Sequence, residues 1–152
     1  MTVLHLDSAA ATEALGARLA GATAGGGIVW LRGDLGTGKT TLVRGLLRAL
    51  GHAGPVRSPT YTLMEPYSIG RRRIFHLDLY RLGDPQELEY IGLRDLLDGD
   101  SILLVEWPER GQGVLPAADL ELELTYAGSG RQCRLRADSS LGEKMLAGLA
   151  AE

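Results

Sequence analysis

A glycine-rich segment near residue 35 carries the residue types that hold a phosphate chain. It fits the pattern G-x-x-x-x-G-K-[ST] at every fixed position, as Gly33, Asp34, Leu35, Gly36, Thr37, Gly38, Lys39 and Thr40. Backbone N–H groups must point inward around an anion, and glycine tolerates the angles that this requires. Lys39 can reach the β- and γ-phosphates, and the Thr40 hydroxyl can bind Mg²⁺. The pattern predicts a nucleotide-binding P-loop; the alternative is a chance glycine-rich turn.

Phosphoryl transfer also needs a carboxylate for the metal, at the carboxyl end of a buried strand near the loop. Two apolar runs end in one: Glu106 follows 102–105, and Asp78 follows 74–77. We assign magnesium to Glu106, because its strand is the more continuous run, although the usual P-loop residue is Asp. Asp78 would then orient water or hold a switch loop. The alternative is that one of the two only caps an element or pairs with an arginine.

Other side chains near these motifs have open roles. The segment after the loop helix carries three hydroxyls that could sense the γ-phosphate or Mg²⁺: Ser58, Thr60 and Thr62. Ser-Pro-Thr is, however, usually a turn that enters a strand. His76 is interpreted as a packed residue rather than a catalytic one. Trp107 directly follows Glu106, and it either lies against a nucleotide or packs under the loop.

The elements that position these residues begin with a strand, the glycine loop and a helix. A compact apolar run at 28–31 predicts a strand buried on both faces. After the loop, apolar residues recur at helical spacing up to Gly51. A helix over 9–22, capped by Asp7 or Ser8, and an edge strand over 2–6 precede this unit.

The second half of the chain is predicted to begin with strands over 61–67 and 73–79 and a helical stretch from 84 to about 98, which Gly92 interrupts. A strand over 102–105, a hairpin of strands 120–126 and 131–137, and a helix over 140–151 follow. In the hairpin, alternation places Glu121 opposite Arg136 and Leu122 opposite Leu135. Together the elements predict a single α/β domain over residues 1–152.

Composition narrows the class of protein. The 152 residues are 45% hydrophobic and 23% charged, as in an ordinary globular domain. Cys133 is the one cysteine, which excludes an internal disulfide and a thiolate metal cluster. The sequence shows neither a signal peptide nor an apolar run of about 20 residues, so we expect a cytoplasmic protein with no membrane association. Residues 39–81 hold eight basic and two acidic side chains. This excess of positive charge suits polyanionic ligands or acidic partners. The alternative is a solvated loop with scattered arginines.

Four segments carry a resemblance to a known family: GDLGTGKTT (33–41), SPTYTL (58–63), HLDLYRL (76–82) and LLVEWPERG (103–111). In this order they resemble the TsaE (formerly YjeE) ATPases of tRNA threonylcarbamoyladenosine biosynthesis, across essentially the whole chain. Many families share the first segment, whereas the other three are far more particular. The resemblance implies a P-loop α/β domain with a mixed central β-sheet flanked by helices. Such a domain binds ATP or ADP with Mg²⁺ and hydrolyses ATP slowly alone.

The resemblance also implies partners. The chain would join the TsaD–TsaB pair, which transfers a threonylcarbamoyl group to adenosine 37 of tRNAs that read codons starting with A. Its ATP cycle would reset the complex between turnovers rather than perform the transfer. Contact with tRNA would be indirect, through the complex.

The family's functional residues map onto this sequence one by one. Lys39 and Thr40 match the phosphate and metal positions, and Thr41 ends the same motif. Glu106 matches the second metal ligand, and Asp78 a residue needed for hydrolysis. Thr60 and Thr62 fall in a switch-like loop, Trp107 lies beside the nucleotide, and Arg131 is a candidate nucleotide contact.

Three other classes of protein remain to be weighed. A small-molecule kinase would need a lid, and the chain has little length for one. A GTPase needs the guanine-reading N-K-x-D motif, which cannot be present because the sequence contains no Asn. Glu106 and Asp78 argue against a binding module that does not turn over. None of Arg57, Arg81 and Arg110 can be assigned as an arginine finger, so we expect slow intrinsic turnover if a partner supplies that charge.

Overall fold

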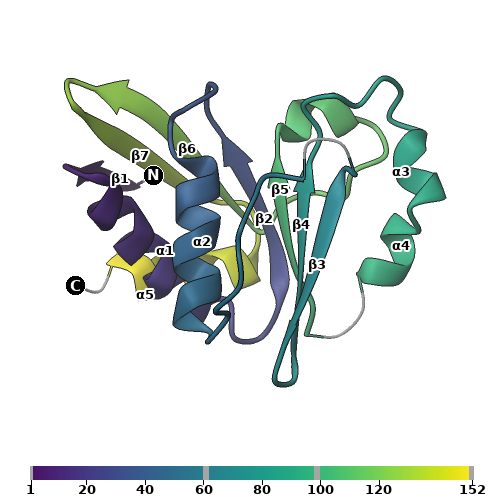
Figure 1. Ribbon diagram of the computed structural model, residues 1–152, viewed down its shortest axis with the longest axis horizontal. Helices are drawn as coiled ribbons and strands as arrows, with labels where there is room; N and C mark the ends of the chain where they lie inside the picture. The colour runs from purple at the N-terminus through teal and green to yellow at the C-terminus, as the bar shows by residue number, and fades with distance from the viewer. Residues whose placement is uncertain (1, 60–61, 98–99, 151–152) are drawn as a thin grey trace.

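A mixed β-sheet forms the centre of the protein. The computed structural model describes residues 2–59, 62–97 and 100–150. These residues form seven strands: β1 (Thr2–Leu6), β2 (Gly27–Arg32), β3 (Met64–Ile69), β4 (Arg72–Asp78), β5 (Ile102–Glu106), β6 (Leu120–Ala127) and β7 (Gly130–Ala137). Their order in the sheet is β1-β7-β6-β2-β5-β4-β3 (Figure 1). The four neighbours β6, β2, β5 and β4 are parallel, whereas β1, β7 and β3 pair antiparallel. The mixed sheet that the family resemblance implies is confirmed.

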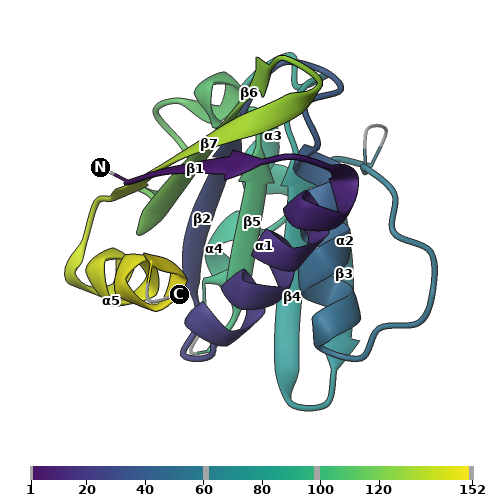
Figure 2. The ribbon, with the colours of Figure 1, turned by 90° about the vertical axis from the view of Figure 1, so that its left-hand side faces the viewer.

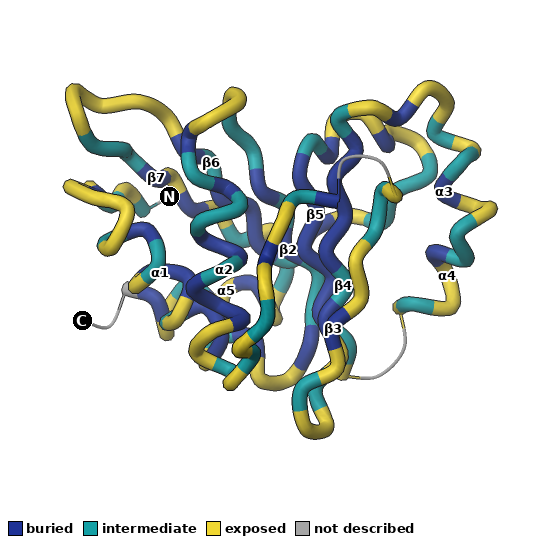
Figure 3. Tube along the Cα trace, in the orientation of Figure 1, coloured by how far each residue is buried: buried dark blue, intermediate teal, exposed yellow. Residues whose placement is uncertain are grey.

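Helices cover both faces of this sheet (Figure 2). One apolar cluster contains residues of α1 (Ala9–Ala22), α2 (Lys39–Ala49) and α5 (Ser140–Ala150), and the other contains residues of the short helices α3 (Glu87–Tyr90) and α4 (Leu93–Leu96). All of β5 is buried (Figure 3), and its residues alternate between the clusters. Ile102 and Leu104 join the first cluster, and Leu103 and Val105 the second. No helix in the described part of the chain is long and apolar enough to cross a membrane.

Two glycines let α1 and α2 pack closely. A Cβ on Gly16 would collide with the backbone carbonyl of Leu42, and a Cβ on Gly45 would collide with that of Glu13. The helix backbones therefore meet where these glycines face them. This contact fixes the position of α2, and therefore also the position of its first turn, which follows the glycine loop.

The predicted elements are largely present, with some changed ends. The hairpin register is confirmed, with Glu121 paired to Arg136 and Leu122 to Leu135. Ser8, rather than Asp7, caps α1 by accepting a bond from the backbone of residue 11. The prediction of a strand over 61–67 was wrong at its start: β3 begins at Met64, because Leu63 has a φ of 67°, and residue 61 lies outside the described residues. The stretch predicted from 84 to 98 is two short helices, separated at a left-handed glycine.

Candidate functional site

The glycine loop connects the end of β2 to the start of α2. Gly33, Gly36 and Gly38 have φ angles of 148°, 81° and 110°, which side chains other than glycine rarely adopt. Gly38 directly precedes α2, so the first turn of the helix opens into the loop. The unpaired N–H groups of that turn, together with the helix dipole, favour an anion at this position.

The β6–β7 hairpin holds the loop from its outer side. The Tyr126 hydroxyl donates to the Leu35 carbonyl at 2.7 Å. The Arg131 guanidinium donates to the carbonyls of Thr37 at 3.0 Å and Gly36 at 3.3 Å, and it stacks on the Tyr126 ring. Three consecutive loop carbonyls thus have donors from the hairpin. The sequence indicated Arg131 as a residue of this region but did not indicate Tyr126, which lies 91 residues from Leu35 in the sequence.

Lys39 is buried at the inner side of the loop. Its side chain donates to the Gly33 carbonyl, and its Nζ lies 3.9 Å from the centre of the Trp107 ring. Burial lowers the pKa of the Lys39 ammonium, whereas the carboxylates of Glu106 and Asp78 oppose this by raising that pKa. The lysine is therefore a cation placed between the loop and two acidic side chains.

The two carboxylates lie side by side at the carboxyl ends of β4 and β5, where Asp78 and Glu106 are direct neighbours in register. Glu106 Oε2 accepts from the Thr40 hydroxyl at 3.5 Å and lies 2.6 Å from His76 Nε2. Glu106 therefore faces the helix that follows the loop.

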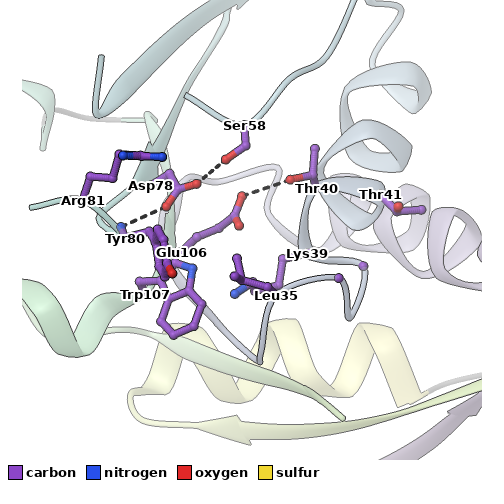
Figure 4. A pocket seen from close by; sticks show the side chains of 12 residues that line it. Leu35, Lys39, Thr40, Thr41, Ser58, Asp78, Tyr80, Arg81, Glu106 and Trp107 are labelled. Atoms are coloured by element: carbon purple, nitrogen blue, oxygen red, sulfur yellow. Dashed lines mark hydrogen bonds between the residues drawn. The ribbon is translucent and has the colours of Figure 1, made fainter. Parts of the chain in front are cut away.

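Asp78 has different partners (Figure 4). Its Oδ2 accepts from the Ser58 hydroxyl, and its Oδ1 accepts from the Tyr80 backbone N–H at 3.0 Å. Asp78 is thus tied to the segment that connects α2 with β3. The two carboxylates lie together but hold different parts of the chain.

A cleft of about 470 Å³ joins these groups. Lys39, Thr40 and Thr41 line it from the helix, Ser58 from the connecting segment, and Asp78, Tyr80, Arg81, Glu106 and Trp107 from the sheet side (Figure 4). A second cleft of about 140 Å³ lies beside the loop and shares Gly36, Gly38 and Thr41 with the first. Ser8, Thr12 and Arg131 line this smaller cleft.

Trp107 lines the large cleft and also packs against the second apolar cluster. Its backbone has a φ of 57°, an uncommon left-handed conformation for a residue with a side chain. The ring contacts the Lys39 ammonium and also the Tyr80 ring, whose centre is 5.0 Å away. Such strained residues are concentrated at functional sites.

The remaining predicted residues are placed as follows. Thr60 lies outside the described residues. Thr62 is exposed, donates to the Met64 carbonyl at 3.2 Å and does not line the large cleft. Of the three arginines considered, Arg81 lines this cleft, Arg110 stacks on Tyr80, and Arg57 borders a separate groove.

The sequence left two cleft neighbours without a role in the site, His76 and Tyr80. His76 is packed, as predicted, but it also contacts Glu106. Its spacing of two from Asp78 on a strand was the available signal, because such residues share a face.

A glycine-rich loop between a parallel strand and a helix defines the class of P-loop proteins. In this chain Lys39 and Thr40, at the start of the helix, complete the sequence pattern of that class. A family model described as "Threonylcarbamoyl adenosine biosynthesis protein TsaE" matches residues 6–133. The chain belongs to the TsaE family.

Individual relatives agree with this family. A protein of Haemophilus influenzae is 52% identical over 119 residues, which cover 78% of this chain and 75% of the relative. A protein of Nostoc is 40% identical over 134 residues, covering 86% and 82%. Both carry the name tRNA threonylcarbamoyladenosine biosynthesis protein TsaE. The crystal structure of YdiB from Bacillus subtilis superposes with a TM-score of 0.78 at 27% identity, covering 99% of this chain and 94% of that one.

Proposed function

We propose that this chain is the ATP-binding and slowly ATP-hydrolysing subunit of the machinery that installs threonylcarbamoyl on adenosine 37 of tRNAs reading codons that start with A. It folds as a single P-loop domain over residues 1–152. Its ATP cycle supports repeated turnover by the TsaD–TsaB pair, and tRNA is reached through that complex, in the cytoplasm. The observation that supports this is the convergence of Lys39, Asp78 and Glu106 on one cleft, in a chain of the TsaE family.

The oxygens in the cleft fit magnesium. The Thr40 hydroxyl and the Glu106 carboxylate lie 3.5 Å apart, and Mg²⁺ prefers oxygen ligands. Among the described residues, no group of three or more His, Cys, Asp or Glu side chains could hold a metal. Mg²⁺ commonly binds through one or two protein ligands, with phosphates and water completing its shell. Bound there, the ion would neutralise charge on the phosphates.

The phosphate chain would lie across the loop and the first turn of α2. Lys39 now donates to the Gly33 carbonyl, and a phosphate would replace that carbonyl as its partner. The purine would occupy the smaller cleft, which shares Gly36, Gly38 and Thr41 with the large one and so continues from the phosphate site. Arg131 lines this cleft and also holds the loop.

Asp78 would act on hydrolysis rather than on binding. Its carboxylate accepts from Ser58 and from the Tyr80 backbone, so it links the segment after α2 to the cleft. A segment held in this way can respond to the γ-phosphate, as switch loops do. In this proposal Asp78 positions Ser58 and the attacking water, and Glu106 serves the metal.

The test measures Mg²⁺-dependent ATP hydrolysis and ATP binding by the purified protein and three variants. Glu106→Gln keeps an acceptor for His76 but removes the charge, so metal-dependent binding and turnover should both weaken. Asp78→Ala should lower turnover by about 10²–10⁴-fold while binding largely survives. Glu143→Ala is the control, because Glu143 is an exposed carboxylate on α5.

Normal ATP hydrolysis by Asp78→Ala would contradict the role of Asp78. Full magnesium-dependent ATP binding and hydrolysis by Glu106→Gln would contradict the role of Glu106. The place of the chain in tRNA modification needs a second experiment. A pull-down with TsaD and TsaB, with and without ATP, should show an ATP-dependent complex. The Asp78→Ala variant should enter that complex yet fail to support multiple rounds of modification.

A further inference from the structure

We propose that His76 is a positioning residue that orients the Glu106 carboxylate in the magnesium site. This inference rests on the proposed function and extends it behind the metal. His76 Nε2 lies 2.6 Å from Glu106 Oε2, and neither side chain is more than 4% exposed. A hydrogen bond this short and this well shielded from water constrains the carboxylate strongly.

The strand arrangement creates this contact. His76 and Asp78 point to the same face of β4, and His76 pairs in register with Leu104, two residues before Glu106 on β5. The imidazole therefore lies beside the strand end from which the Glu106 side chain leaves. His76 is fully buried, so it reaches the carboxylate from within the core.

The hydrogen-bond partners assign the proton on the imidazole. An ionised carboxylate only accepts, so Nε2 of His76 carries the hydrogen and donates it to Glu106. His76 Nδ1 is buried, and no described residue hydrogen-bonds to it. Nε2 is therefore the ring nitrogen through which His76 holds the carboxylate.

This contact leaves the rest of Glu106 available. The weaker bond from the Thr40 hydroxyl ends on the same Oε2 atom, at 3.5 Å, and Oε1 has no hydrogen bond among the described residues. If the Thr40 hydroxyl turns to a metal ion, His76 still holds the carboxylate. Glutamate has one more rotatable bond than the aspartate usual at this position, so it loses more freedom on ordering. His76 supplies the constraint that the longer side chain needs.

The experiment compares three substitutions at this position. His76→Gln places an amide nitrogen where Nε2 lies and can donate to Glu106. His76→Asn places its amide where Nδ1 lies and cannot reach, which makes it the matched polar control. His76→Leu removes all polar atoms at similar volume. Binding of Mn²⁺ in the presence of saturating ADP is measured by electron paramagnetic resonance, and binding of ADP is measured separately in EDTA.

We expect His76→Asn and His76→Leu to weaken Mn²⁺ binding by about 10–100-fold, the usual cost of losing a group that orients a metal ligand. His76→Gln should bind Mn²⁺ within a few-fold of the wild type. ADP binding in EDTA should be unchanged in all three. Equal effects on Mn²⁺ and on metal-free ADP, or no difference between the Gln and Asn variants, would overturn the inference and leave His76 a packing residue.

A second measurement uses the wild-type protein, so it does not depend on whether a variant folds. The ¹⁵N shifts of the His76 ring should show a protonated Nε2 that is hydrogen-bonded to a carboxylate. A bare Nε2 would refute the proposed contact. If the wild type binds ADP but binds no Mn²⁺ together with it, the proposed magnesium site itself is refuted. That outcome differs from every result that would refute only the role of His76.

Discussion

Removing the hairpin donors behind the P-loop should weaken nucleotide binding through the shape of the loop, so the loss should also appear with a ligand that has no base. The peptide bond is planar and trans, so each carbonyl points opposite to the N–H of the next residue. Tyr126 and Arg131 hold the carbonyls of residues 35–37 toward the hairpin. The N–H groups of Gly36 and Gly38 are thereby directed to the opposite side, where the phosphates are proposed to lie.

The size of the effect follows from these bonds. Arg131 donates two of the three, and a hydrogen bond from a charged donor contributes about 1.5–3 kcal/mol when buried. Arg131 is only half-buried, so we expect Arg131→Ala to cost about 1–2 kcal/mol of binding free energy, roughly 5–30-fold in affinity. Tyr126→Phe removes one neutral bond, and we expect about 0.5–1 kcal/mol, roughly two- to fivefold.

The assay titrates ATP, ADP and inorganic tripolyphosphate by calorimetry. If Arg131 acts through the loop carbonyls, all three ligands should weaken by the same factor, because tripolyphosphate has no base to contact. Arg134→Ala is the matched control, since Arg134 is an exposed arginine on the same strand, paired in register with Glu123. Unchanged tripolyphosphate binding in Arg131→Ala would refute the reasoning and assign Arg131 to the base or ribose. An equal loss in Arg134→Ala would show only a general charge effect.

Three further outcomes are expected. In a Trp30→Phe background, the fluorescence of Trp107 should change on adding saturating ADP, and no change would place its ring outside the nucleotide site. Gly45→Ala should lower the free energy of unfolding in urea by about 1–3 kcal/mol, because its Cβ would overlap a carbonyl of α1. Gly21→Ala, with open space around it, should leave that free energy unchanged or raise it. Burial raises the pKa of the Cys133 thiol to about 12, so it should resist alkylation at pH 8 until the protein unfolds, and rapid labelling of the native state would contradict that burial.

Local patterns in the sequence predicted much of the fold. The loop at 33–40 is contiguous, and its glycines stand where the backbone has positive φ. The β6–β7 register followed from period-two alternation and opposite charges, because a slip of one residue would expose the apolar face. The carboxylates at the ends of two apolar runs were also found, because the carboxyl ends of parallel strands meet at one edge of a sheet.

Tertiary structure decided which remote residues meet. His76 contacts Glu106 across 30 residues of sequence, and Tyr126 contacts Leu35 across 91. These contacts depend on the order of the strands in the sheet, which no short-range pattern encodes. The start of β3 also depends on a remote residue. The Leu63 carbonyl accepts a hydrogen bond from the Asp78 backbone N–H, and this bond forms only when β4 lies alongside. The sequence by itself therefore determined the loop, the strands and the acidic side chains, whereas packing determined the partners of each one, because a partner's position is set by the whole sheet rather than by neighbours in the chain.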